Sequence, residues 1–313
     1  MQKAVRIINQ GINNLAYFWS FPEIVANTKG YFKDEGITVV FHDVTPGEVV
    51  LNKSEMYKEL QKEGKQDVYH AAEYVCITRA IGNSTGKIVA YSPWVKNGLN
   101  ASFGLYVDAK SGIKKPEDLT DKSIAIENGT GSYYTTLEDL EQHIPREHIR
   151  LTQIGDPHLR LKALVRGEVA AASVMGPYAD LAERIGMVKL MESKRRRGTL
   201  MIARNDVDSS TLSAYIKATN RAISDINTRP DEHKTLYFEW FSKIIPRLAQ
   251  KMRSTAEKMR LTITVPAWKE WEPYSESDFN YIYDWMVERK LVEAGHKYKD
   301  LVDLRAFHKL NRT

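Results

Sequence analysis

The feature that most constrains the fold of this chain is a supersecondary pattern that occurs twice. In the first half, hydrophobic periodicity and turn residues predict a strand, a polar turn, a helix and a second strand at residues 5–8, 9–14, 16–29 and 37–41. The same order returns at residues 123–126, 127–131, 132–143 and 149–154. Each unit continues into a further helix and strand, the strands being at residues 67–69 and 169–174. The repetition predicts two α/β lobes of similar construction.

Strands that alternate with helices form mainly parallel sheets with helices on both faces. We therefore expect a two-lobe α/β fold in which each lobe is a mixed, mainly parallel sheet flanked by helices, with a two-strand hinge. Residues 87–109 would cross from one lobe to the other, and residues 199–207 would cross back. The resulting boundaries place lobe 1 at residues 1–95 and 201–313 and lobe 2 at residues 96–200.

The length and charge of the chain bound its class. At 313 residues the chain is long enough for about two domains. The 45 basic and 40 acidic residues give a net charge of +5, so the surface is mixed and a nucleic-acid partner is not expected. The basic run at residues 194–197 is interpreted as a solvated turn. The mostly helical remainder, residues 208–313, is expected to pack on lobe 1.

Cofactor chemistry has no signature in the sequence. The single cysteine, Cys76, rules out an intramolecular disulfide and a cysteine-based metal site. No histidine or carboxylate spacing predicts a metal, and the phosphate-loop, dinucleotide and nucleophile-elbow motifs are missing, so we expect no cofactor and no metal.

No apolar run approaches a membrane span, and Met1 leads directly into a strand-like pattern. Two locations stay open: cytoplasmic if the sequence is native, and extracytoplasmic if a leader was trimmed.

The repeated modules predict where a ligand would bind. In open α/β sheets ligands lie beyond the carboxyl ends of the strands, and in two facing lobes these ends border one cleft. The loops that would line this cleft are residues 9–19, 70–74, 92–94, 129–133 and 175–178.

Three segments of the sequence resemble one family. They read ANTKGYFKDEGITV, GLYVDAKSGIKKPEDLTDKSIAIENGTG and ALVRGEVAAASVMGPYADLAERIG. The second is the most specific, because a strand, a Pro-Glu-Asp-Leu turn, another strand and a glycine turn before a helix follow one another. The segments resemble the type II periplasmic-binding-protein fold, in the branch for nitrate, sulfonate, taurine and a thiamine pyrimidine precursor. The resemblance extends from about residue 5 to about residue 229.

This resemblance implies two kinds of activity. Most such proteins are solute receptors for ABC importers, which close about a hinge and are read by a membrane permease. Some relatives are enzymes on the same scaffold: a cysteine-dependent desulfinase, a pyrimidine-forming thiamine enzyme and a chorismate dehydratase. The chain carries YFWS at residues 17–20, where the desulfinase-like relative has its cysteine, and it lacks the cysteine-rich motif of the thiamine enzyme. Both departures count against those chemistries.

The glycine turn at Gly129, Thr130, Gly131 and Ser132 is the first candidate site. Glycines let the backbone approach a ligand, and N–H groups at a helix start attract an anion. The alternative is a simple capping turn with Ser132 or Thr130 as the cap. Together with the family resemblance, the turn predicts a site for an acidic or oxygen-rich group.

The second candidate site follows the strand at residues 67–69. Glu73 would face a ligand amine or ring N–H, or it would only begin a solvent-facing helical turn. His70 is suited to acid–base work near neutral pH, although a lone histidine is more often structural. Cys76 fits a buried apolar residue better than a nucleophile. We expect no catalytic residues in a receptor; an enzyme would use His70, Glu73 and Cys76.

Aromatic residues are frequent in the predicted loops, and such side chains suit stacking on a flat ring. The residues expected to bind the ligand are Asn13, Tyr17, Trp19, Glu73, Tyr74, Trp94, Gly129, Thr130, Gly131, Ser132, Tyr133, Pro177 and Tyr178.

The leading hypothesis is a solute-binding protein that holds a small heterocyclic or aromatic solute in the interlobe cleft for an ABC importer. Closure would occur about residues 92–96 and 200–204. The alternative is a cytoplasmic enzyme on the same fold, acting by acid–base or hydrolytic chemistry on a similar small molecule. The expected partners are a small-molecule ligand and, for a receptor, an ABC permease, and the chain is expected to be a monomer or a weak dimer.

Overall fold

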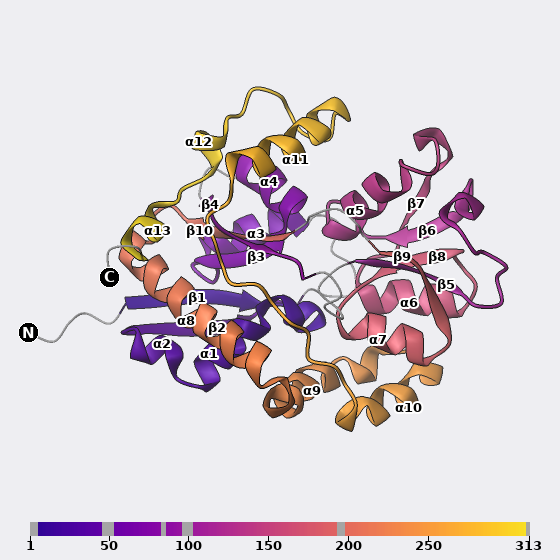
Figure 1. Ribbon diagram of the computed structural model, residues 1–313, viewed down its shortest axis with the longest axis horizontal. Helices are drawn as coiled ribbons and strands as arrows, with labels where there is room; N and C mark the ends of the chain where they lie inside the picture. The colour runs from indigo at the N-terminus through magenta and orange to yellow at the C-terminus, as the bar shows by residue number, and fades with distance from the viewer. Residues whose placement is uncertain (1–5, 46–52, 83–85, 96–102, 193–197, 311–313) are drawn as a thin grey trace, which may run out of the picture.

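The computed structural model describes residues 6–45, 53–82, 86–95, 103–192 and 198–310, which form two α/β lobes (Figure 1). In lobe 1, β1 (Arg6–Ile12) pairs in parallel with β2 (Ile37–Asp43). The other three strands, in the order β3 (Val68–Ala72), β10 (Gly198–Arg204) and β4 (Gly86–Pro93), form a second sheet.

The two sheets of lobe 1 are linked by hydrogen bonds between β1 and the residues just before β3. The Asp67 N–H donates to the Asn9 carbonyl at 2.7 Å, and the Asn9 N–H donates to the Asp67 carboxylate at 2.7 Å. Strand β10 runs antiparallel to both of its neighbours. It is the strand through which the chain returns from lobe 2.

Lobe 2 is a single five-stranded sheet. Its strand order is β7 (Arg150–Gln153), β6 (Ser123–Ile126), β8 (Ala171–Val174), β5 (Gly104–Asp108) and β9 (Met187–Glu192). Strand β6 is parallel to β7 and β8, whereas β5 is antiparallel to β8 and β9. The lobe 2 sheet is therefore mixed, and lobe 1 combines a parallel pair with an antiparallel sheet. Both lobes have helices flanking their strands, as the alternating pattern predicted.

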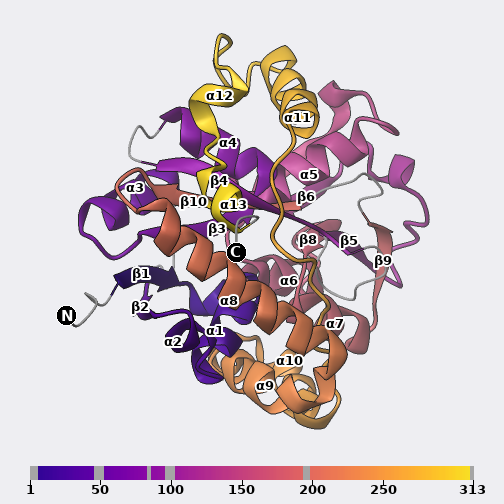
Figure 2. The same ribbon diagram turned by 60° about the vertical axis from the view of Figure 1, so that its left-hand side comes forward.

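The helices divide among three regions (Figures 1 and 2). Lobe 1 carries α1 (Phe21–Thr28), α2 (Tyr31–Asp34), α3 (Lys53–Lys62), α4 (Glu73–Gly82), α8 (Ser209–Thr228) and α13 (Arg305–Leu310). Lobe 2 carries α5 (Gly131–Leu140), α6 (Pro157–Val165) and α7 (Pro177–Arg184). The C-terminal region adds α9 (Lys234–Ser242), α10 (Gln250–Lys258), α11 (Glu276–Glu288) and α12 (Tyr298–Leu301).

Two local predictions near the N-terminus are wrong. The polar residues after Ile8 were expected to turn, but β1 continues to Ile12, because Gln10 and Gly11 stay paired with β2 and the Gln66 side chain accepts the Gly11 N–H at 2.9 Å. The helix expected at residues 16–29 is divided into a 3₁₀ segment, η1 (Asn14–Ser20), and α1, with Pro22 in the first turn of α1. Strand β9 was not anticipated.

The C-terminal region contacts both lobes, so its assignment to lobe 1 alone is wrong. Helix α8 packs against α1 and α2 of lobe 1. Helix α10 packs against α7 of lobe 2, where Arg184 donates to the Thr262 carbonyl at 2.8 Å. The chain then rises between the lobes to α11, whose cap is Ser275, which accepts the Asp278 N–H at 3.0 Å (Figure 1).

Some predicted features cannot be placed. The basic run at residues 194–197, most of the crossing between β4 and β5, and Lys96 of the expected hinge lie outside the described residues. Among the helices that are described, none combines the length and apolarity needed to cross a bilayer. Within the same residues no cluster of histidine, cysteine and carboxylate side chains could hold a metal ion.

Candidate functional site

A hollow of about 100 Å³ lies between the lobes, with residues of both on its walls. Lobe 1 contributes Asn13, Trp19, Tyr57, His70, Ala72 and Arg79. Lobe 2 contributes Phe103, Glu127, Thr130, Gly131, Asp156 and Arg160. We call this hollow the cleft. The turn at Thr130 and the loop at Trp19 therefore face one shared space.

The start of α5 forms the lobe 2 edge of the cleft. The Thr130 hydroxyl donates to the Glu127 carbonyl at 2.8 Å, and the Ser132 hydroxyl accepts the Glu127 N–H at 3.0 Å. These bonds hold the turn from within. A Cβ atom on Gly131 would lie 2.6 Å from the Phe103 ring and 2.9 Å from the Ala72 Cβ, so glycine is required for the lobes to approach here. The positive end of the α5 dipole thus borders the cleft.

Arg160, on α6, is a cation whose hydrogen bonds are made within lobe 2. Its Nε donates to the Ser173 carbonyl at 2.6 Å, and its Nη1 donates to the Gly155 carbonyl at 2.5 Å. Glu127 Oε2 lies 4.0 Å from Nη1. Burial lowers the pKa of Arg160, and the charges of Glu127 and Asp156 oppose that effect. The arrangement ties Arg160 to the wall of the cleft.

Arg79, on α4, is the contrasting cation on the lobe 1 wall. The residue is 5% exposed, and its Nε and Nη1 atoms are buried without a hydrogen bond among the described residues. The guanidinium carbon lies 4.1 Å from the centroid of the Tyr57 ring and 5.4 Å from that of Tyr69. Within the part of the chain that the structure describes, no carboxylate forms an ion pair with it. Its charge is stabilised by aromatic faces rather than by an anion.

His70 and Glu23 form a neutral pair behind the lobe 1 wall. The His70 side chain is fully buried, with Nε2 3.6 Å from Glu23 Oε1, and its ring lies 4.9 Å from that of Trp271. Burial lowers the pKa of His70 to about 4 and raises the pKa of Glu23 to about 8. Both groups are therefore uncharged near neutral pH. The residue is 8% exposed as a whole, so only the main chain of His70 reaches the cleft.

The other two residues of the enzyme hypothesis also point away from the cleft. Glu73 Oε2 accepts the N–H of Gly198 at 2.8 Å, where β10 begins. The Cys76 thiol is fully buried, 3.5 Å from the carbonyls of Ala71 and Leu200, and burial raises its pKa to about 12. A thiolate is therefore strongly disfavoured at neutral pH. His70, Glu73 and Cys76 do not converge on a common space.

The structure divides the residues expected to bind the ligand into three groups. Asn13, Trp19, Thr130 and Gly131 line the cleft. Trp19 and Trp94 line an adjoining apolar hollow. The remaining predicted residues line neither hollow: Tyr17, Glu73, Tyr74, Gly129, Ser132, Tyr133, Pro177 and Tyr178.

Two examples show why predicted aromatic residues lie away from the cleft. Tyr17 is fully buried, with its ring 5.1 Å from that of Tyr237. Tyr178 is also fully buried, and its hydroxyl donates across the lobes to the Leu15 carbonyl at 2.9 Å. Both side chains support the walls of the cleft from behind.

Sequence reasoning missed the two arginines of the cleft, together with Tyr57, Phe103, Glu127 and Asp156. A signal was available for the arginines. Arg79 follows a run of buried residues on α4, and Arg160 shares the buried face of α6 with Leu164. A charge on the apolar face of a helix is a candidate functional or anchoring residue, because charges are seldom buried without a purpose.

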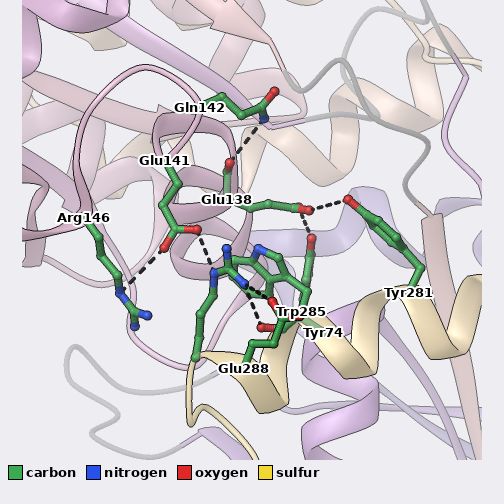
Figure 3. Close-up of polar contacts among 9 residues, drawn as sticks. Tyr74, Glu138, Glu141, Gln142, Arg146, Tyr281, Trp285 and Glu288 are labelled. Carbon is green, nitrogen blue, oxygen red and sulfur yellow. Dashed lines mark hydrogen bonds and ion pairs between the residues drawn. The ribbon is translucent and has the colours of Figure 1, made fainter.

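The lobes are also joined outside the cleft, at α5. The Tyr74 hydroxyl donates to Glu138, the Tyr281 hydroxyl donates to Glu138 Oε1 at 3.2 Å, and Arg289 Nε donates to Glu141 Oε2 at 2.7 Å. Figure 3 shows Tyr74 of α4 and Tyr281 of α11 reaching Glu138 of α5. We call Tyr74, Glu138, Glu141, Tyr281 and Arg289 the α5 latch. With it in place, the lobes are in contact on the α11 side of the molecule.

Two mixed α/β lobes around a shared cleft define the type II periplasmic-binding-protein fold. A family model described as NMT1/THI5 like matches residues 19–233. The match covers more than half of the chain, which therefore belongs to the NMT1/THI5-like family. A search of curated proteins found no match.

Solved structures of the same fold include both binding proteins and an enzyme. The alkanesulfonate-binding protein SsuA from Xanthomonas axonopodis pv. citri, bound to MOPS, is 12% identical, with a TM-score of 0.71 and coverage of 95% of this chain and 98% of that one. The periplasmic aliphatic sulphonate binding protein SsuA from Escherichia coli is 15% identical, with a TM-score of 0.71 and coverage of 96% and 92%. The desulfurization enzyme DSZB is 12% identical, with a TM-score of 0.60 and coverage of 98% and 99%. At these identities the likeness concerns the fold.

Proposed function

We propose that this chain is a solute-binding protein of an ABC importer and that its cleft holds a small aromatic or heterocyclic acid. The observation that carries the proposal is Arg79, a buried cation on the cleft wall with two guanidinium nitrogens lacking hydrogen-bond partners among the described residues. An acidic group on the solute would supply charge-assisted hydrogen bonds to this side chain.

The surroundings of Arg79 support an acid with a flat ring. The dipole of α5 adds positive potential from the opposite wall, at Gly131. Trp19 and Phe103 offer ring faces on either side, and Asn13 and Thr130 offer polar side chains. Glu127 and Asp156 do not oppose an anion strongly, because Arg160 lies beside them.

Transport requires the lobes to part and close. Strands β4 and β10, which pair from Gly198–Pro93 to Arg204–Gly86, lead toward lobe 2 and fit the role of a hinge. The carboxylate of Glu73 would brace this hinge by holding the first N–H of β10. We therefore assign Glu73 a positioning role in closure in place of ligand contact. Likeness to periplasmic sulfonate-binding proteins supports an extracytoplasmic location and a permease partner.

A screen of small acids tests the proposal. A ligand that binds the native state raises the unfolding temperature, so benzoate, pyridine carboxylates, arylsulfonates and their neutral amides would be compared by thermal shift. We expect acids to stabilise the protein and the matched amides to leave it unchanged. Each acid that binds would then be recovered and analysed by mass spectrometry. Recovery unchanged supports a receptor, conversion supports an enzyme, and stabilisation by the amides alone contradicts the role of Arg79.

A further inference from the structure

Beyond Trp19 the cleft adjoins a second hollow, which we call the tryptophan compartment. Four of the six tryptophans of the chain line it: Trp19, Trp94, Trp268 and Trp271. Its other walls combine the apolar residues Phe18, Pro22, Pro93, Val95, Met175, Ile223, Pro266 and Ala267 with the polar residues Ser92, Thr199 and Lys269. The compartment and the cleft share Phe18, Trp19 and Met175 as a common wall.

Three rings separate the two spaces. Phe103 borders the cleft, Trp94 borders the compartment, and Trp19 borders both. The centroid of the Trp19 ring lies 6.2 Å from that of Trp94 and 6.3 Å from that of Phe103, and the latter two are 5.7 Å apart. Trp94 is fixed by its Nε1, which donates to Thr199 Oγ1 at 3.0 Å. Among the described residues no hydrogen bond fixes the Trp19 indole nitrogen, so Trp19 is held by ring packing alone.

Two hydroxyl groups at the edge of the compartment are engaged in hydrogen bonds with the protein. The Ser92 hydroxyl donates to the Lys269 carbonyl at 2.6 Å, and the Thr199 hydroxyl accepts from Trp94. The Trp271 indole nitrogen lies beside the Glu23 carboxyl, which is uncharged near neutral pH. A guest would therefore meet mainly ring faces and apolar side chains, together with the Trp271 indole N–H, which is buried without a hydrogen bond among the described residues. Such walls favour an apolar ring over a polar one.

The space itself sets a condition on binding. With the lobes in contact the compartment measures about 30 Å³, which suits a water molecule but not a ring. The compartment is bordered by Thr199 of β10 and Trp94 after β4, and by Trp268 of the C-terminal region. A turn of Trp19, or a small parting of these three segments, would join it to the cleft.

We propose that the tryptophan compartment receives the apolar ring at the far end of an elongated organic acid, whose charged end lies at Arg79. The preferred solute is then an amphipathic anion with two ring systems, or with one ring set well apart from the acid. This inference rests on the proposed function, because the acid at Arg79 places the molecule. It adds a size and polarity requirement that the cleft alone does not impose.

Calorimetry with two matched acids tests the inference. Benzoate fits within the cleft, whereas biphenyl-4-carboxylate carries a second ring that needs the compartment. We expect the wild-type protein to bind biphenyl-4-carboxylate roughly tenfold or more tightly than benzoate, because the second ring is removed from water. The variant Ala267→Phe would fill the compartment, since Ala267 lines it and not the cleft. It should abolish this preference and change benzoate binding by less than about threefold.

Controls keep the outcomes distinct. Ala267→Ser, which adds little volume, should retain the wild-type preference. A fluorescence titration of the wild-type protein needs no variant, and biphenyl-4-carboxylate should change the tryptophan emission more than benzoate does at saturation. Equal affinity for the two acids, or a preference that survives in Ala267→Phe, overturns the inference and leaves the proposed function standing. Failure of both acids to bind the wild-type protein contradicts the proposed function itself.

Discussion

The two walls of the cleft each bury an arginine, but they treat its charge differently. On the lobe 2 wall, Arg160 donates to two carbonyls and lies beside Glu127. On the lobe 1 wall, Arg79 has no carboxylate partner among the described residues, and the buried carboxyl of Glu23 lies by His70 instead. The difference separates an arginine bonded to the protein wall from one with two guanidinium nitrogens that lack hydrogen bonds among the described residues, which is why we propose that a solute binds the second.

The comparison also explains why the lobe 1 wall tolerates an uncompensated cation. Burying an unpaired charge lowers the stability of the folded state by roughly several kcal/mol unless another group offsets the loss of hydration. The faces of Tyr57 and Tyr69 offset part of this cost for Arg79. An anionic solute would offset the remainder at Arg79. Arg160 offers no such gain, because its guanidinium already donates to carbonyls of the protein.

Replacing Arg160 should have the largest effect, and the effect should be on folding. Arg160→Met leaves the carbonyls of Ser173 and Gly155 without their donor and Glu127 without its nearby cation. We expect a loss of about 3–5 kcal/mol in the free energy of unfolding, measured by urea denaturation. The matched variant Arg79→Met should lose about 1 kcal/mol or less, because it removes a charge without a buried ionic partner. Equal losses of unfolding free energy in the two variants would contradict the proposed difference between the two arginines.

Replacing Arg79 should have the next largest effect, and the effect should be on binding. Arg79→Gln is expected to weaken the affinity for an aromatic acid such as benzoate about ten- to hundredfold, the cost of a lost charge-assisted interaction. Arg79→Lys should recover only part of the affinity, since lysine lacks the planar fork of donors. Isothermal titration calorimetry measures both. An unchanged affinity in Arg79→Gln, with the unfolding temperature intact, would place the acid elsewhere.

The acid of the lobe 1 wall gives a pH test. Glu23 has its pKa raised to about 8 by burial, above its ordinary value, so folding favours its protonated form and its contribution to stability falls as pH rises toward 8. His70, with its pKa lowered to about 4, contributes stability above its ordinary pKa near 6.5 and loses it as pH falls toward 4. Between pH 6.5 and 8 Glu23 alone of this pair therefore titrates in the folded state.

In that window we expect the wild-type protein to lose about 2 kcal/mol of stability relative to Glu23→Gln, whose amide does not titrate. Denaturation at pH 6.5, 7.2 and 8 measures the difference. Parallel stability profiles for the two proteins would show that Glu23 is already ionised at neutral pH.

The α5 latch should give the smallest effect. Arg289 and Glu141 are partly exposed, so this ion pair contributes about 0.2–1 kcal/mol and weakens with salt. Arg289→Ala is expected to weaken solute affinity about two- to fivefold by favouring the open arrangement. The loss should shrink at high ionic strength. Arg166→Ala removes an exposed ion pair with Glu168 that belongs to neither the latch nor the cleft, and it controls for general effects. A salt-independent loss in Arg289→Ala would exclude an ionic latch.

The fold was predictable from sequence because its modules are local. Strand β6 coincides with the predicted residues 123–126, since four apolar or small residues stand between a charged turn and a glycine turn. The extension of β1 through Gln10 and Gly11 was not predictable, because the Gln66 side chain that satisfies Gly11 lies far along the sequence. Nor was β9, whose partner is β5 across the lobe 2 sheet.

The candidate site was predictable in its loops and not in its charges. Parallel-strand topology brings the Trp19 and Thr130 loops to one cleft, and the structure shows them there. Glu73 follows β3 as expected, but the direction of its side chain depends on how α4 is rotated, and this turns it toward Gly198. The positions of Arg79 and Arg160 on the apolar faces of their helices signal burial, but which groups lie opposite each guanidinium depends on tertiary packing, which no local pattern reports.

One feature of the C-terminal region bears on how fast a solute could exchange. A two-lobe receptor that bends only at its connecting strands needs to change a few backbone torsions. Here α11 is also attached to lobe 2 through Tyr281 and Arg289, and Arg184 ties lobe 2 to Thr262. For the lobes to separate, the hydrogen bonds of Tyr281, Arg289 and Arg184 would also have to break. Residence time would be governed at the periphery of the molecule, by groups that never touch the solute, while selectivity would be governed at its centre.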